Sequence, residues 1–295
     1  MVGQTITLWQ GPPCNKREVS AQIVQIFEPF TTYCTMLLNF ISSPGPQGAV
    51  VLKLFDRRFA TKLGRDHGIC PWFRALDVEY FRFVTSGGAL EFLTRLDNSE
   101  GEPFNAAQNE AFLHQLMWSR FRTEVEAYDL MKDLQGECVP RQLESVTFPG
   151  YYVSCGESVD RFFKIPGILF EYIHGFPLRL VSGNAPRDTW QSICEEAIRV
   201  VHLIGDRGIL NEDVKTRSFN VREEPGPKFK VFMLDFALCS FRHQYRDEAH
   251  WRESKAKHDE EGAVGVDLQR YLQGAFVYRR SDRYKALDEE FMEAG

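Results

Sequence analysis

Short apolar runs bounded by turn residues dominate the early part of the chain and return near its middle. They are rich in β-branched and aromatic residues, which predicts β-strands at residues 21–27, 35–41, 49–55, 143–148 and 151–155. The first two runs are close enough in sequence to form a hairpin. Residues 1–20 are mostly polar and contain Gly11-Pro12-Pro13, which predicts an irregular N-terminal arm.

Helical periodicity is clearest over residues 106–134. The apolar stripe there consists of Leu113, Met117, Phe121, Tyr128 and Met131, which predicts a long helix with one buried face. Glu124 falls inside this stripe. Because a buried carboxylate without a partner is costly, Glu124 needs a nearby cation. Lys53, inside the apolar run at 49–55, is the candidate; the alternative is that its side chain reaches solvent.

Residues 56–110 separate these elements and predict two shorter helices, at 77–84 and 89–96. A basic group, Arg57, Arg58, Lys62 and Arg65, opens the segment. Charged groups of this kind usually form a solvated face. The segment contains no motif that assigns it a role, and whether it binds a partner stays open.

Two acids flank a predicted hairpin in the second half of the chain. Asp213 precedes a strand at 219–221, a turn through Pro225 and Gly226 follows, and a returning strand at 229–234 leads to Asp235. Paired strands have a defined register, so both acids lie at the same end of the hairpin and can face one cleft. Such a pair suits proton abstraction by one carboxylate and Mg²⁺ binding by the other, as phosphoryl transfer requires. A solvated turn is the alternative.

Composition favours a globular protein, because 43% of the 295 residues are apolar and 13% are aromatic. At this length we expect two lobes or domains. A net charge of −6 without a long basic run argues against nucleic-acid binding. Seven cysteines without a Cys-x-x-Cys pair favour reduced thiols and no zinc site. No leader or membrane-spanning run is present, so we expect an intracellular protein, cytoplasmic or nuclear, that does not bind membranes.

The order of residue types around the hairpin resembles the protein-kinase-like superfamily. Asp213-Val214-Lys215, an apolar strand pair and then Asp235-Phe236-Ala237 resemble its catalytic loop and its metal-binding Asp-Phe-Gly. The resemblance implies a bilobal α+β fold, with an antiparallel sheet and a long helix in the N-lobe and a mainly helical C-lobe. It places the N-lobe and hinge at 21–173, with the insertion at 56–110, and the C-lobe at 174–295.

Only 58 residues follow Ala237, which predicts a shortened C-lobe. In this respect the chain is similar to the aminoglycoside and choline phosphotransferases and to compact fungal kinase-like proteins. The resemblance also implies ATP and Mg²⁺ as cofactors.

The resemblance assigns the phosphates of the nucleotide to the N-lobe. Lys53 matches the strand lysine that holds them, and Glu124 matches the helix glutamate that pairs with this lysine. In kinases a glycine-rich hairpin tip also contacts the phosphates, but the tip between the first two predicted strands contains no glycine. The hydroxyls of Thr31 and Thr32 would have to replace those backbone contacts.

The apolar run that leads into Gly175 resembles the hinge between the lobes, where backbone groups meet adenine. By that match, the Glu171 carbonyl and the Ile173 amide are the candidate adenine contacts. An ordinary buried strand is the alternative.

The hairpin carries the remaining parts of the resemblance. Asp213 matches the residue that positions or deprotonates the acceptor hydroxyl, and Lys215 matches the cation that steadies the γ-phosphate. Asp235 matches the principal Mg²⁺ ligand. Where the family has a metal-binding asparagine, this chain has Ser218, and Asn220 follows on the same side of the strand. Serine is a weaker, neutral ligand for Mg²⁺.

Three functional hypotheses follow. The first is an ATP- and Mg²⁺-dependent phosphotransferase that acts on a hydroxyl of a protein or small molecule. The second is a pseudokinase, a nucleotide-binding or empty scaffold that binds a partner protein; the missing tip glycines and Ser218 favour it. The third is an unrelated α+β binding protein.

Overall fold

The computed structural model describes residues 2–11, 16–30, 32–41, 48–96, 103–149, 156–226 and 228–291. The chain forms two compact units. One comprises Met1–Phe121 with Gln142–Tyr172, and the other comprises Arg122–Arg141 with Ile173–Gly295. Helix α4 (Ala106–Leu130) contributes residues to both units. The predicted strand at 151–155 lies outside the described residues, and the predicted lobe limits of 21–173 and 174–295 stay a prediction.

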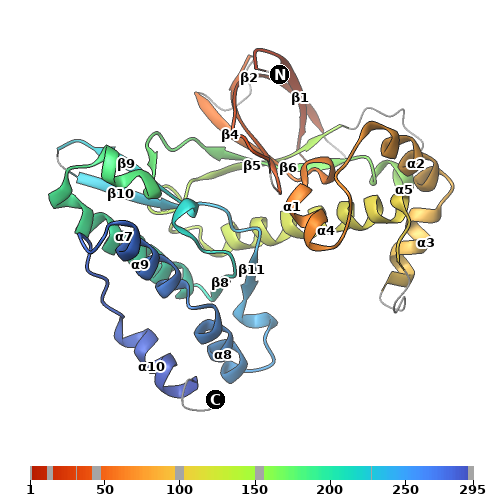
Figure 1. Ribbon diagram of the computed structural model, residues 1–295. Coiled ribbons are helices and arrows are strands. Elements are labelled where there is room, and N and C mark those ends of the chain that lie inside the picture. Colours follow the sequence, from red (N-terminus) through yellow and green to blue (C-terminus); the bar gives the residue numbers. More distant parts are fainter. Residues whose placement is uncertain are drawn as a thin grey trace. The chain divides into compact units, whose positions relative to one another are not determined.

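The first unit is built on a closed barrel of six antiparallel strands (Figure 1). Around the barrel the order is β1-β2-β3-β4-β6-β5. The strands are β1 (Thr5–Gln10), β2 (Arg17–Ile26), β3 (Cys34–Phe40), β4 (Ala49–Leu54), β5 (Gln142–Phe148) and β6 (Ile165–Glu171). Alternate residues face inward, so Leu8, Leu38, Leu52 and Leu169 lie in one apolar core, each fully buried.

Residues 5–10 and 17–20 lie in strands β1 and β2, so this part of the chain is not the irregular arm that its polar composition predicts. Strand β1 pairs with β2 over its whole length and with β5 at Trp9 and Gln10, and this closes the barrel. Ile6, Leu8 and Gln10 alternate with more exposed residues and are buried. This period of two is the signal of a half-buried strand. The Gly11-Pro12-Pro13 sequence that follows it obscured the pattern.

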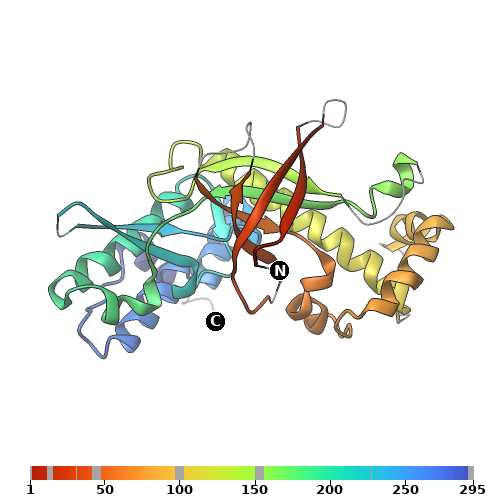
Figure 2. The same cartoon turned by 90° about the horizontal axis from the view of Figure 1, so that it is seen from above.

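The insertion at 56–110 is a helical layer with its own core. It contains α1 (Thr61–Asp66), α2 (Arg74–Thr85) and α3 (Gly88–Arg95). Helix α2 includes the helix predicted at 77–84, and α3 matches the one predicted at 89–96 to within one residue at each end. Figures 1 and 2 show α2 and α3 beside the N-terminal half of α4, together with the short helix α5 (Glu157–Asp160). The buried cluster there comprises Tyr80, Val84, Ala89, Ala111, Phe162 and Phe163.

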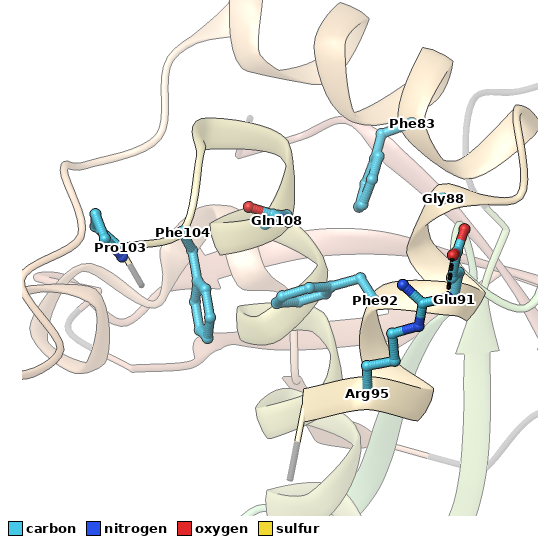
Figure 3. Close-up of a pocket in the computed structure, with 8 residues that line it drawn as sticks. All are labelled: Phe83, Gly88, Glu91, Phe92, Arg95, Pro103, Phe104 and Gln108. Carbon is cyan, nitrogen blue, oxygen red and sulfur yellow. Dashed lines mark ion pairs between the residues drawn. The ribbon is translucent and has the colours of Figure 1, made fainter. Parts of the chain in front are cut away.

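The outer end of this layer encloses a cavity of about 350 Å³. Figure 3 shows Phe83 of α2, Phe92 of α3 and Phe104 facing a common space, with Glu91 and Arg95 of α3 paired at its side. The rings of Phe92 and Phe104 meet edge to face at 4.9 Å. We call this the Phe92 cavity.

The second unit combines two small sheets with helices. One sheet has the order β10-β9-β7 and the other pairs β11 with β8. The strands are β7 (Phe176–Pro177), β8 (Ile209–Asn211), β9 (Phe219–Glu224), β10 (Lys228–Met233) and β11 (Cys239–Phe241). The helices are α6 (Val181–Asn184), α7 (Trp190–Gly205), α8 (Glu248–His258), α9 (Glu260–Tyr271) and α10 (Asp282–Phe291).

The core of the second unit lies where α7 packs against β10 and α9. Val201 and Ile204 of α7, Val231 of β10, and Val264 and Leu268 of α9 are buried there. The two units together confirm the predicted α+β class: an antiparallel sheet with a long helix, followed by a mainly helical part. The five cysteines that the structure describes are free thiols.

Candidate functional site

The hairpin β9–β10 places Asp213 and Asp235 at the same end. Its register runs from Glu224 opposite Lys228 at the turn to Phe219 opposite Met233 at the open end. The pairing continues beyond the strands, because the Leu234 amide donates to the Ser218 carbonyl at 2.7 Å. Asp235 is the next residue after this bond, so it lies beside the loop that Asp213 begins. The juxtaposition that the sequence predicted is therefore present.

Asn211 ties the backbones of the two acids together. Its buried side chain accepts a hydrogen bond from the Asp213 amide at 3.0 Å and donates one to the Asp235 carbonyl at 3.0 Å. An amide side chain carries both an acceptor and a donor, so one residue can serve both loops. The sequence analysis did not identify this role, because it depends on two loops that are far apart in the sequence.

Glu260, the first residue of α9, in turn holds Asn211. Its carboxylate accepts a hydrogen bond from the backbone amide of Asn211 at 2.8 Å and pairs with Lys255. Glu260 is 2% exposed and the Lys255 side chain 12%, so this pair is shielded from solvent. A buried carboxylate satisfied in this way fixes the backbone that it contacts. The sequence analysis did not identify Glu260.

The Asp213 carboxylate is partly exposed and carries two cations. Lys215 pairs with its Oδ1 atom, and the Arg217 guanidinium donates to Oδ2 at 3.1 Å. Lys215 and Arg217 are themselves about half exposed, so solvent screens both pairs. Lys215 thus lies at Asp213, and its predicted contact with the γ-phosphate stays a prediction. Arg217 is an additional cation that the sequence analysis did not name.

Asp235 is exposed and has a left-handed backbone, with φ 68°. Aspartate tolerates this conformation better than most residues because its short side chain can bond locally. Beyond it the chain is anchored: Phe236 is buried, its ring lies 5.5 Å from that of Tyr128, and its amide donates to Glu124 at 3.4 Å. Burial raises the pKa of the Tyr128 hydroxyl, and the nearby charges of Glu124 and Asp235 raise it further. The acid therefore projects from a firmly held turn.

Ser218 and Asn220 lie next to this end of the hairpin. Ser218 is buried, and the Asn220 Nδ2 atom donates to the Ile173 carbonyl at 2.9 Å, which leaves its side-chain oxygen as the candidate metal donor. Ser218, Asn220 and Asp235 offer only oxygen atoms, which suits Mg²⁺. Within the described ranges, no three His, Cys, Asp or Glu side chains cluster as a metal site would require.

In the first unit, Lys53 lies on β4, opposite Thr35 of β3 and Ile168 of β6. It is 7% exposed, and its ammonium lies 4.1 Å from the centre of the Tyr33 ring and 5.4 Å from that of Phe55. Such cation–π contacts stabilise a buried ammonium. Thr32 lies between β2 and β3, as the predicted tip requires, and Thr31 lies outside the described residues.

Glu124 is 1% exposed and belongs to the second unit, where it accepts the Phe236 amide. Its placement in the buried stripe of α4 is as predicted. Its pairing with Lys53 would join residues of different units and stays a prediction. Glu171 is the last residue of β6, and Ile173 begins the second of the two chain segments that form the second unit. Their proposed contacts with adenine also stay predictions.

Comparison with known proteins identifies the fold class. The Rio2 kinase–ADP/Mg²⁺–phosphoaspartate complex from Chaetomium thermophilum matches with a TM-score of 0.50 and 14% identity, over 90% of this chain and 60% of that one. WaaP in complex with acyl carrier protein has a TM-score of 0.43 and 13% identity, over 92% and 84% of the two chains. The chain has a protein-kinase-like fold, which confirms the prediction.

The likeness to Rio2 is one of fold, and this chain spans about 60% of the Rio2 chain. No family model and no curated protein sequence matches the chain. Among the described residues, no helix combines the length and the apolar character needed to cross a bilayer.

Proposed function

We propose that this protein is a phosphotransferase that uses ATP and Mg²⁺ to phosphorylate a hydroxyl group of a protein or small molecule. The observation that carries the proposal is the Asn211 side chain, which holds the Asp213 and Asp235 backbones together at one end of a hairpin. Two carboxylates fixed in this way can act on neighbouring oxygens of one reaction. The kinase-like fold supports the proposal, and the Rio2 structure of similar fold is a complex with ADP and Mg²⁺.

In this proposal Asp213 aligns the acceptor hydroxyl and accepts its proton. One carboxylate oxygen must then be available, although Lys215 and Arg217 contact both oxygens here. The Arg217 pair is exposed and of the i,i+4 type, which contributes only about 0.3–0.5 kcal/mol. An acceptor can displace it readily. Lys215 remains close enough to offset negative charge that develops during transfer.

Asp235 would hold Mg²⁺, with Ser218 and Asn220 as neutral oxygen donors. Bound Mg²⁺ supplies charge neutralisation at the phosphates. Its preference for one or two carboxylates, completed by water and phosphate oxygens, fits this donor set. The left-handed turn at Asp235 and the burial of Phe236 would keep the carboxylate in place.

The nucleotide would be held by residues that the resemblance assigns. Lys53, paired with Glu124, would contact the phosphates, with Thr31 and Thr32 at the hairpin tip. The Glu171 carbonyl and the Ile173 amide would meet adenine. The Asn220 side chain bonds to the Ile173 carbonyl, which supports a fixed orientation of the peptide that follows that residue.

A second candidate function is a pseudokinase that binds a partner protein. The absence of glycine from the hairpin tip at 27–33 and the presence of Ser218 favour it. Both features weaken contacts to phosphate and metal, so they would matter most for turnover.

Thermal unfolding with and without ATP and Mg²⁺ is the first test. ATP at a hundred times its dissociation constant should stabilise the folded protein by about 2.7 kcal/mol. Absence of any shift would contradict the phosphotransferase and leave only a pseudokinase scaffold that binds no nucleotide. Asp235→Asn should lose the Mg²⁺-dependent part of the shift, and Glu224→Gln, at the other end of the hairpin, should keep it.

Transfer of labelled phosphate from ATP to cell-extract fractions is the second test. Asp213→Asn should abolish the transfer and retain the ATP-induced stabilisation. Unchanged transfer would remove Asp213 from its proposed role. Stabilisation by ATP without transfer in any fraction would favour the pseudokinase.

A further inference from the structure

The first unit contains a second cavity, of about 330 Å³, between the end of β4, helix α2 and the N-terminal half of α4. Its inner walls are aromatic, formed by Tyr80, Phe162 and Phe163. Tyr80 and Phe163 meet edge to face at 6.0 Å, and the Tyr80 hydroxyl donates to the Phe162 carbonyl at 2.9 Å. We call this the Tyr80 cavity. Lys53, Asp213 and Asp235 do not line it.

Arg57 forms the charged side of the Tyr80 cavity. Its side chain is 8% exposed, so the prediction that the basic group from Arg57 to Arg65 is a solvated face is wrong for this residue. Its guanidinium bonds to Asp77 at 2.6 Å, pairs with Glu110, and lies 4.2 Å from the Tyr80 ring centre. Two carboxylates and a ring compensate its desolvation. Arg57 is therefore fixed in place, and the group that it forms with Asp77 and Glu110 has one more carboxylate than cations.

His114 completes the wall as a neutral ring. Burial and the nearby charge of Arg57 lower its pKa to about 3. The imidazole is thus uncharged at physiological pH and adds aromatic surface, not charge. A pocket that combines aromatic walls, convergent polar groups and a titratable residue with a strongly shifted pKa has the typical features of a ligand site.

The mouth of the Tyr80 cavity is positive. Arg74, the first residue of α2, lines it, and the Arg161 guanidinium lies 4.8 Å from the ring centre of Phe162. Neither arginine pairs with a carboxylate in the described part of the chain. Val78 also lines the cavity and is 52% exposed. Along the inner wall the two cations Arg57 and Arg58 face three carboxylates, whereas Arg74 and Arg161 bring two further cations to or near the opening.

We propose that the Tyr80 cavity binds a small molecule that joins an aromatic ring to an anionic group. The ring would lie against Tyr80, Phe162 and Phe163, and the carboxylate, sulfonate or phosphate would reach Arg74 and Arg161. Aromatic side chains favour a ring by stacking and burial, and guanidinium groups favour oxyanions by charge-assisted hydrogen bonds. The cavity volume lies at the lower end of the range for small-molecule sites, which favours a compact ligand.

The test uses two fluorescent probes that differ in one charged group. 1-Anilinonaphthalene-8-sulfonate carries an aromatic body and an anion, and N-phenyl-1-naphthylamine lacks the sulfonate. The full chain should bind the sulfonate at one saturable site. Arg74→Glu combined with Arg161→Glu should weaken that binding about fivefold or more, because attraction becomes repulsion, and should leave the neutral probe unaffected.

Val78→Trp supplies a steric test. The added ring would narrow the mouth from an exposed position, so both probes should bind more weakly. The matched control is Arg95→Glu, an exposed charge reversal beside the Phe92 cavity, which should leave both affinities unchanged (Figure 3). All changed side chains are solvent-accessible, and thermal unfolding of each variant checks that the fold persists.

Several results would overturn the proposal. The first is the absence of saturable binding of the sulfonate probe. The second is a wild-type affinity for that probe in both the double charge variant and Val78→Trp. The third is a loss of affinity in Arg95→Glu as large as that in the double variant. Displacement of the probe by ATP and Mg²⁺ would mean that the probe occupies the nucleotide-binding residues and would also contradict the proposal. If either the double charge variant or Val78→Trp fails to fold, probe binding to the other variant tests the proposal. Because the readout is probe binding, it is independent of phosphotransfer.

Discussion

Two pairs of acids in the second unit show how differently one protein can place carboxylates. Glu260 and Glu261, at the start of α9, are almost wholly buried, whereas Asp213 and Asp235 open to solvent. The Glu260 carboxylate accepts a hydrogen bond from the backbone amide of Asn211 and forms an ion pair with Lys255. Glu261 pairs with His202 at 2.5 Å and receives the Tyr278 hydroxyl at 2.8 Å.

The difference separates acids that hold the backbone in place, which we call framework acids, from acids that can take part in a reaction. The buried pair is saturated with donors, so it can fix backbone but cannot accept a proton or a metal without breaking those bonds. The cations on Asp213 are exposed and screened by solvent, and the backbones of Asp213 and Asp235 are both held by Asn211. Glu260 connects the two pairs, because its carboxylate holds the backbone of Asn211. The Asn211 side chain in turn bonds to the backbone amide of Asp213 and the backbone carbonyl of Asp235.

Removing a framework acid should have the largest effect on stability. Glu260→Ala leaves Lys255 buried without its charge partner and the Asn211 amide without its acceptor, which should cost roughly 3–5 kcal/mol in the free energy of unfolding. Chemical denaturation measures this. Glu248→Ala on α8 removes an exposed acid paired with Arg242 and should change stability by less than about 0.5 kcal/mol. Equal losses would mean that burial does not distinguish the two acids.

Removing an exposed acid should show the opposite profile. Asp235→Asn should lower phosphotransfer by about a hundredfold or more and leave the free energy of unfolding nearly unchanged, because the side chain is exposed. Initial rates at saturating ATP and denaturation curves measure the two effects. A variant that loses stability and activity together would place Asp235 in the framework.

Acid titration should sharpen the same comparison. Burial raises the pKa of Glu261, but hydrogen bonds from His202, Ser281 and Tyr278 outweigh it and lower the value from 4.5 to about 2. Its contribution, roughly 3 kcal/mol, is therefore full above pH 4.5 and is lost as pH falls towards 2.

Unfolding free energies of the wild type and Glu261→Gln, measured between pH 2 and 6, test this. The advantage of the wild type should shrink below pH 4.5. An advantage that stays constant across this range would exclude the assigned shift. Glu195→Gln, an exposed change on α7, is the matched control.

The smallest effect is expected at the exposed cations of Asp213. Arg217→Ala removes an exposed i,i+4 pair, so the free energy of unfolding should change by less than about 0.5 kcal/mol. Phosphotransfer should be retained or rise, because one Asp213 oxygen becomes available to the acceptor. A strong loss of transfer at unchanged ATP binding would instead assign Arg217 a direct role.

Local patterns were sufficient for the parts of the fold that repeat along the chain. Strand alternation located the hairpin ends at Asp213 and Asp235, and helical periodicity located Glu124 in a buried stripe. Glu261 obeys the same rule, since Val264 and Leu268 follow it at three and seven residues and are buried. The polar neighbours of Glu261 obscured that stripe.

Other features depend on partners far away in the sequence. Arg57 looked solvent-exposed because its partners, Asp77 and Glu110, come from two later helices. The role of Asn211 needed two loops and α9 to be in place. No local pattern encodes such contacts, and the pairing of Lys53 with Glu124, predicted from a resemblance, stays a prediction.

The closed barrel of the first unit restricts how that unit can meet other proteins. Each of its strands has a neighbour on both sides, because β1 links β2 to β5. An open sheet would present a row of unsatisfied amides and carbonyls to which a foreign chain could add a strand. Where neighbouring strands of the barrel pair, strand addition is closed off, and a partner that meets the barrel there has to contact side chains instead.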